Sequence, residues 1–94
     1  MISMILIKRL VLDVLKPRKP NTLDFAKSLA ELQHGYLVTA SVQEIDDKTE
    51  SIILKVSGND IQFDKLSEAI KVLGGSLHSI DEVEVVNTSD FSAE

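Results

Sequence analysis

One short segment, from Arg9 to Lys16 with the sequence RLVLDVLK, most constrains how this chain folds. Its apolar residues occupy both parities, and charges at Arg9 and Asp13 interrupt them. A strand with water on one face alternates between apolar and polar residues, so this strand is expected to have atoms packed against each face. The segment Pro17–Pro20 then ends the strand, because proline cannot continue a hydrogen-bonded ladder.

The apolar pattern extends this first strand over roughly residues 4–16. One face carries Leu6, Leu10, Leu12 and Val14. The other face also holds Arg9 and Asp13, so it is the candidate for contact with a partner or with solvent. The apolar members of this second face are Ile5, Ile7, Val11 and Leu15.

Signals for two helices flank the middle of the chain. Asn21 is a good N-cap, and Asp24 three residues later forms a pair like a capping box, so a helix is predicted to start there and to stop at Gly35. A second helix is predicted over residues 61–73, and the Gly74–Gly75 pair ends it.

Three further strands complete the pattern. Residues 38–43 and 52–57 alternate between apolar and polar side chains, and the short polar segment 46–50 joins them as a hairpin. A last strand is predicted over residues 76–86. Its alternation slips, and a bulge between Ile80 and Val83 would restore it.

The order β-α-β-β-α-β predicts an α+β, ferredoxin-like domain over residues 1–86, with residues 87–94 as a loose tail. Four antiparallel strands form the sheet, the first and third strands are central, and both helices cover one face. Ile53 of the third strand then joins Ile5, Ile7, Val11 and Leu15 on the uncovered face. Exposed apolar patches of this kind mark interfaces, so a homo-oligomer is expected.

Composition narrows the possible partners and location. The net charge is −5, and the chain has one Tyr, three Phe and no Trp, so nucleic acid is not an expected partner. Cysteine is absent, which excludes disulfides and thiolate metal sites. The apolar runs are too short to span a bilayer and lack the features of a signal peptide. We therefore expect a cytoplasmic protein with no membrane partner.

Three motifs resemble a known family. They are RLVLDVLKP from Arg9, EID from Glu44 with Thr49 and Glu50 after it, and GGSLHSIDEV from Gly74. Together they resemble the archaeal domain-of-unknown-function family number two hundred and eleven, over roughly residues 7–83. The resemblance implies a ferredoxin-like fold, an archaeal cytoplasmic origin and a tendency to form ring-like oligomers. It implies no activity.

A divalent cation is one candidate ligand. Asp13 lies within an apolar strand, where a carboxylate needs a neighbouring strand, a second subunit or a cation to compensate its charge. The last strand is expected beside the first, which brings His78, Asp81 and Glu82 towards Asp13. Such an oxygen-rich group suits Ca²⁺ or Mg²⁺. The alternatives are that Asp13 has a structural partner in the protein and, separately, that His78 is a structural histidine with no ligand role.

An anion is a second candidate. Lys16, Arg18 and Lys19 lie in the loop that leads into the first helix, whose free N–H groups attract anions. The same loop is catalytic in acylphosphatases, which share this fold, but no glycine-rich cradle is present here. The alternative is that these charges are solvated or lie in an interface.

No motif positions a base beside a nucleophile, and no nucleotide-binding fingerprint occurs. The sequence therefore favours a self-assembling binding or regulatory module without catalysis. A divalent-cation-binding protein is the alternative, and an acylphosphatase-like hydrolase is a second alternative.

Overall fold

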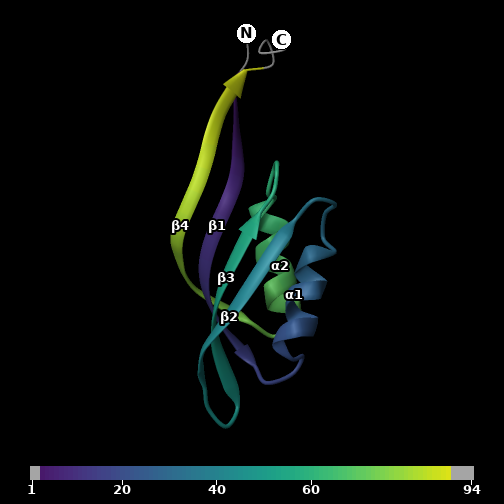
Figure 1. Cartoon of the computed structure of the whole chain (residues 1–94), viewed down its shortest axis with the longest axis vertical. Helices are drawn as coiled ribbons and strands as arrows, with labels where there is room; N and C mark the ends of the chain where they lie inside the picture. The colour runs from purple at the N-terminus through teal and green to yellow at the C-terminus, as the bar shows by residue number, and fades with distance from the viewer. Residues whose placement is uncertain (1–2, 90–94) are drawn as a thin grey trace.

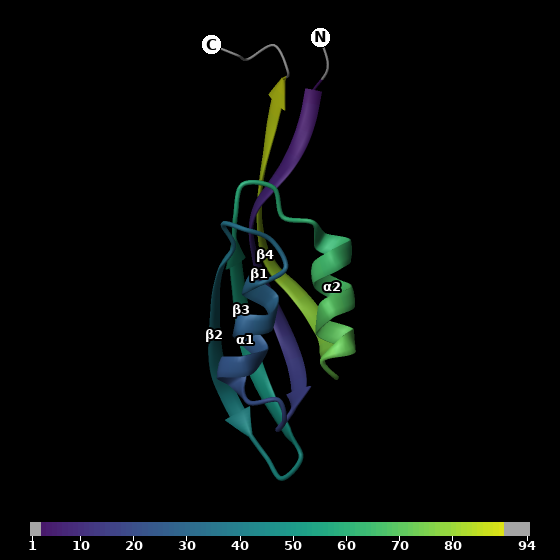
Figure 2. The same cartoon turned by 90° about the vertical axis from the view of Figure 1, so that its right-hand side faces the viewer.

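Six elements follow one another along the chain in the order predicted from the sequence. The computed structural model describes residues 3–89. The elements are β1 (Ser3–Pro17), α1 (Thr22–Ala30), β2 (Leu37–Ile45), β3 (Thr49–Ser57), α2 (Phe63–Val72) and β4 (Ser76–Ser89). The strands form one antiparallel sheet in the order β2-β3-β1-β4, and both helices cover the same face of it (Figures 1 and 2). The ferredoxin-like α+β fold is thereby confirmed.

The core lies between the sheet and the two helices. β1 and β3, the two central strands, supply their inward residues, and each helix inserts two buried side chains. Leu12, Val14, Phe25 and Leu29 have no exposed surface. The full cluster consists of Leu10, Leu12, Val14, Phe25, Leu29, Ile52, Leu54, Val56, Ile61, Leu66 and Ile70. Strand β1 therefore presents its even-numbered residues from Leu10 onward to the helices, as predicted.

The helix boundaries follow local chemistry. Asn21 caps α1, and its Oδ1 accepts a hydrogen bond of 2.8 Å from the backbone N–H of Asp24. This helix ends at Ala30, not at Gly35 as predicted. Gly35 instead adopts φ +94° in the turn before β2. After α2, Gly74 adopts φ +90°, the left-handed conformation that commonly ends helices.

Irregularities in the β1–β4 ladder change which face some residues occupy. Ile7 pairs with Val85 and Arg9 with Glu84, so Lys8 is an extra residue in β1. An extra residue reverses the alternation of side chains. Ile7 therefore packs against the core, and Ile5 shares its side of the sheet. The prediction that Ile5 and Ile7 line the uncovered face was wrong for this reason.

Strand β4 carries two extra residues, His78 and Asp81, at the other register shifts of this ladder. The second of these confirms the bulge predicted between Ile80 and Val83. The strand also continues to Ser89, three residues beyond its predicted end, so residues 87–89 are paired rather than loose. The rest of the predicted tail, residues 90–94, lies outside the described residues.

Candidate functional site

A two-stranded extension, here called the arm, projects beyond the helices. It consists of residues 3–7 of β1 and 85–89 of β4, which pair with each other, whereas β1 pairs with β3 only from Arg9 onward. Figure 1 shows the arm at one end of the molecule, whose longest extent is 53 Å. Ile5 is 63% exposed and Val85 54%. The arm therefore presents apolar side chains where neither helix covers them.

Next to the arm, β4 presents more apolar surface on the helix side of the sheet. Val83 is opposite Leu10, and Ile80 is opposite Leu12, two residues of the core. Both nevertheless remain about half exposed. The helices therefore do not fully cover the helix-facing side of β4.

The sheet face opposite the helices is less apolar than predicted. Of the residues predicted to line it, Val11, Leu15 and Ile53 do lie there. Val11 is only 7% exposed and Ile53 is half-buried, whereas Leu15 is 45% exposed. The edge strand β2 adds Leu37 to this face, where it is 67% exposed. Hydroxyl or charged side chains on the same face come from Thr39, Ser41, Lys55, Ser79, Glu82 and Glu84. Leu15 is thus the main apolar residue that the central strands expose on this face.

An ion pair crosses this face between neighbouring strands. Arg9 Nη1 lies 2.9 Å from Glu82 Oε2, with about a third of the Arg9 side chain exposed. The residue directly opposite Glu82 in β1 is Val11, and Arg9 lies two residues before it, so the ion pair runs diagonally across the ladder. Asp13 is opposite Ile53 on one side and Ser79 on the other. Glu82, a predicted cation ligand, is therefore compensated by an arginine of the same chain.

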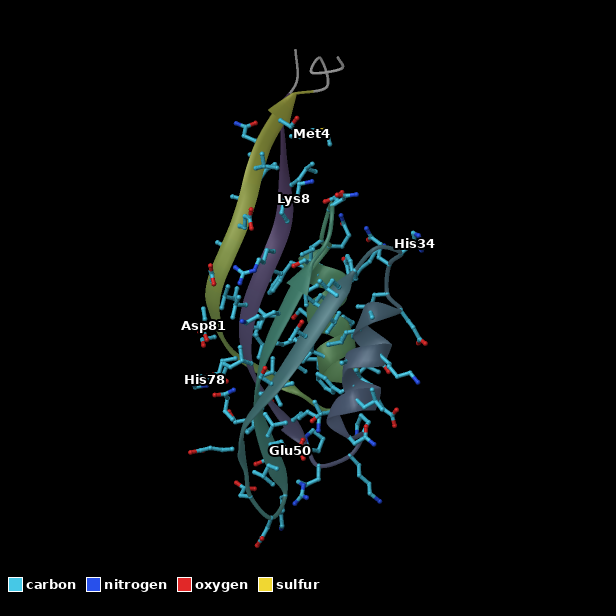
Figure 3. The ribbon with its side chains drawn as sticks, viewed as in Figure 1. Met4, Lys8, His34, Glu50, His78 and Asp81 are labelled. Carbon is cyan, nitrogen blue, oxygen red and sulfur yellow. The ribbon has the colours of Figure 1, made fainter. Side chains whose placement is uncertain are left out.

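The other two predicted cation ligands on β4 lie at the edge of the sheet, away from the central strand that carries Asp13. His78 and Asp81 are the two extra residues of β4, and Figure 3 shows both at its outer edge. Asp81 accepts a hydrogen bond of 2.6 Å from the hydroxyl of Ser79. Within residues 3–89, no three His, Asp or Glu side chains gather closely enough to hold a metal ion. The predicted cluster with Asp13 is therefore not formed in one chain.

At the opposite end from the arm, a buried ion pair joins β1 to β3. Lys16 has no exposed surface, and its Nζ donates to Glu50 Oε1 at 2.8 Å and to the carbonyl oxygen of Pro17 at 2.8 Å. Thr22 donates to the same Glu50 oxygen at 3.0 Å. The hydrogen bond from Lys16 holds the pKa of Glu50 below its ordinary value, against the opposing effect of burial.

Arg18 completes this cluster from the loop before α1. Its Nε lies 3.3 Å from Glu50 Oε2, and its Nη1 donates to the backbone carbonyl of Asp46. Lys19 is exposed in the same loop. Two of the three residues predicted to bind an anion, Lys16 and Arg18, thus already neutralise Glu50. This arrangement does not favour an acylphosphatase-like site, which needs an arginine free to meet the phosphate.

The pairing of Lys16 with Glu50 was missed by the sequence analysis, although a signal was present. Lys16 is an even-numbered residue of β1, like the buried residues Leu12 and Val14. Glu50 alternates in the same way with the buried residues Ile52 and Leu54 of β3. Each residue is a charged side chain at an inward position near the end of a central strand. The two strands were predicted to be neighbours, so the opposite charges were available as partners.

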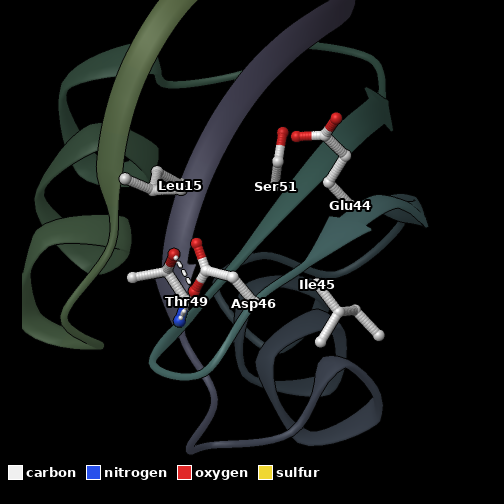
Figure 4. Close-up of a pocket in the computed structure, with 6 residues that line it drawn as sticks. All are labelled: Leu15, Glu44, Ile45, Asp46, Thr49 and Ser51. Carbon is white, nitrogen blue, oxygen red and sulfur yellow. Dashed lines mark hydrogen bonds between the residues drawn. The ribbon is translucent and has the colours of Figure 1, made fainter.

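A shallow pocket of about 260 Å³ lies beside the β2–β3 hairpin (Figure 4). Its lining residues are Leu15, Glu44, Ile45, Asp46, Thr49 and Ser51. Asp46 Oδ1 accepts hydrogen bonds from the backbone N–H groups of Lys48 and Thr49 and from the Thr49 hydroxyl. The backbone hydrogen bond from Thr49, followed by that from Lys48, lowers the pKa of Asp46. Asp46 therefore shapes the turn, and Glu44 is the remaining carboxylate in the pocket.

Comparison with known proteins identifies the family of this chain. The model of an archaeal family, DUF211, described as "Uncharacterized ArCR", matches residues 8–89. The chain belongs to the DUF211 family. One relative, an uncharacterised protein of Methanocaldococcus jannaschii, is 46% identical over 77 residues, which are 82% of this chain and 79% of the relative. The family resemblance seen in the sequence is confirmed. Among residues 3–89 of this DUF211 protein, neither helix is long and apolar enough to cross a membrane.

Proposed function

We propose that this DUF211 protein is a self-assembling binding or regulatory module that carries out no catalysis. The observation that carries the proposal is the arm, together with the adjoining helix side of β4. An isolated two-stranded ribbon is only marginally stable in water, because its apolar side chains have no layer to pack against. Contact with another copy would supply that layer.

The most exposed apolar residues of this region share one side of the sheet, whereas Met4 and Val86 of the arm, 45% and 39% exposed, lie on the other. Ile5, Val83 and Val85 are each more than half exposed and lie on one side of the β1–β4 ladder. Contiguous apolar surface of this kind commonly marks an interaction site. The ring-like assembly implied by the family resemblance agrees with it. A cytoplasmic location fits a chain without cysteine.

The charged groups that would be expected to perform chemistry have structural partners instead. Lys16 and Arg18 contact Glu50, and Arg9 contacts Glu82. These ion pairs join β1 to β3 and β4, and the loop before α1 to β3. This distribution of charge supports an architectural role over a hydrolytic one.

A pair of matched surface variants tests the proposal. Val85→Lys places a charge on the apolar side of β4, whereas Leu23→Lys places the same charge on α1, at a residue that is 67% exposed. We expect Val85→Lys to lower the mass measured by light scattering during size-exclusion chromatography, and Leu23→Lys to leave it unchanged. Equal masses for Val85→Lys and the unmodified protein would argue against assembly through this surface.

A further inference from the structure

We propose that the free edge of β4 in one copy pairs with the free edge of β2 in the next copy, so that the sheets join head to tail. The inference rests on the self-assembly proposed above and specifies its interface. In the order β2-β3-β1-β4, strand β2 has a sheet neighbour only in β3 and β4 only in β1. Each therefore has one side on which its backbone groups have no strand partner within residues 3–89. Such edges are templates for pairing with another chain.

Bulges limit which parts of these edges can pair. Gln43 is an extra residue in β2, and His78 and Asp81 are extra residues in β4. Bulges disrupt the local ladder and oppose pairing. The regular parts that remain are residues 37–42 of β2 and residues 82–89 of β4. The second of these includes the β4 half of the arm, the segment that most needs a covering partner.

Strand direction is compatible with this join. The four strands alternate in direction across the sheet, so β2 and β4 run in opposite directions. Two copies placed side by side in the same orientation therefore bring β4 of one against β2 of the other as an antiparallel pair. The helices of both copies then lie on the same face of the continuous sheet, and both apolar layers adjoin.

Side-chain chemistry matches on both faces of the join. Within one chain, Val42 of β2 lies in the same row as Leu77 of β4, so covering the arm requires the next copy to be shifted along the strands until its Val42 is opposite Val83. In that antiparallel register Val85 is opposite Ala40 on the helix side, beside Val42, which is 40% exposed.

On the opposite face of the same register, Glu84 is opposite the hydroxyl residue Ser41, and Val86 is opposite Thr39. Apolar residues thus meet on the helix side, and the Glu84 carboxylate meets a hydroxyl group that can donate a hydrogen bond to it.

A symmetric pairing of two β4 strands fits less well. In the register that places Val83 opposite Val83 of the other copy, Glu82 of each copy is opposite Glu84 of the other, and like charges directly opposite across a strand pair are destabilising. It would also leave both β2 edges uncovered. The head-to-tail join uses two different surfaces, so it repeats from copy to copy and closes into a ring when the rotation between copies permits.

Cross-linking distinguishes these arrangements, and the absence of native cysteine removes any background. Thr39→Cys marks β2 and Glu84→Cys marks β4, both at exposed residues of the face opposite the helices. Each variant alone, and an equimolar mixture of the two after subunit exchange, is treated with a flexible bismaleimide that tolerates a shift in register. Lys27→Cys on α1 mixed with Glu84→Cys is the control. The products are separated on a denaturing gel.

The head-to-tail join predicts a covalent dimer in the mixture of Thr39→Cys and Glu84→Cys, and little in either variant alone or in the control mixture. A dimer in Glu84→Cys alone would instead establish symmetric β4 pairing and overturn the proposal. An oligomer by light scattering that yields no dimer from the mixture would overturn this interface while leaving self-assembly intact. A monomer by light scattering would remove both proposals.

Discussion

Lys16 and Glu50 are directly opposite each other on the two central strands, and their side chains form a 2.8 Å ion pair from which water is almost excluded. The ammonium group of Lys16 also lies 5.7 Å from the centre of the Phe25 ring, so the pair adjoins the apolar core. With Arg18 and Thr22 on the same carboxylate, the pair ties the ends of β1 and β3 to the start of α1.

Glu50→Gln is expected to destabilise the protein strongly, because it leaves the buried Lys16 ammonium without a compensating charge. Removal of one partner from a buried pair costs about 3–5 kcal/mol. The free energy of unfolding by urea, measured at one protein concentration, checks this. Asp47→Asn, in the exposed hairpin turn, is the control and should change stability by less than about 0.5 kcal/mol. A similar small change for Glu50→Gln would show that the pair contributes little.

Stability should also depend on pH through Glu50. Its pKa is lowered in the folded protein, so the unfolded state binds more protons as the pH falls below about 4.5, the ordinary glutamate value. The contribution of Glu50 is therefore fully present above that pH and is lost on further acidification. The stability difference between the unmodified protein and Glu50→Gln should shrink from neutral pH towards pH 3. A constant difference over this range would contradict the lowered pKa.

Leu12→Ala and Leu15→Ala compare the two faces of β1. Leu12 has no exposed surface, whereas Leu15 is 45% exposed on the face away from the helices. Truncation of Leu12 should lower the free energy of unfolding by about 2–5 kcal/mol. Truncation of Leu15 should cost less than half as much when both variants are measured at the same low concentration. Similar losses at the two positions would mean that both faces are covered.

Chelation should have little effect on thermal unfolding. The cation hypothesis requires the carboxylates of Asp13, Asp81 and Glu82 to repel one another without a metal. Glu82 already contacts Arg9, however, and Asp81 accepts a hydrogen bond from Ser79. Melting curves with EDTA and with millimolar Ca²⁺ should therefore coincide. A rise of several degrees with Ca²⁺ that Asp13→Asn abolishes would restore the cation site.

The fold was predictable because each element carries its own local signals. Asn21 with Asp24 marks the start of α1, and the alternation around Ile52 and Leu54 marks β3 as half-buried. The slipped alternation in the last strand even located the bulge at Asp81. In each case a short stretch of sequence is sufficient, because capping and strand alternation are local properties.

The candidate site was harder to predict because it depends on the alternation of β1 across its whole length. Apolar residues occupy both parities there, so an extra residue at Lys8 leaves no visible break in the pattern. The extra residue moves Ile5 and Ile7 to the helix side of the sheet, so the arm exposes Ile5 on that side. Val11, predicted to be one of the interface residues of the uncovered face, is almost buried in one chain. Val11→Asp would therefore disturb folding as well as assembly.

Sedimentation equilibrium of the unmodified protein at micromolar concentration tests the central claim most directly. The chain has a mass of 10.4 kDa, so self-assembly through the arm and the strand edges predicts a mass that is a multiple of this value. The mass should fall towards 10.4 kDa in Val85→Lys measured under the same conditions. A single species of 10.4 kDa for the unmodified protein would contradict the account.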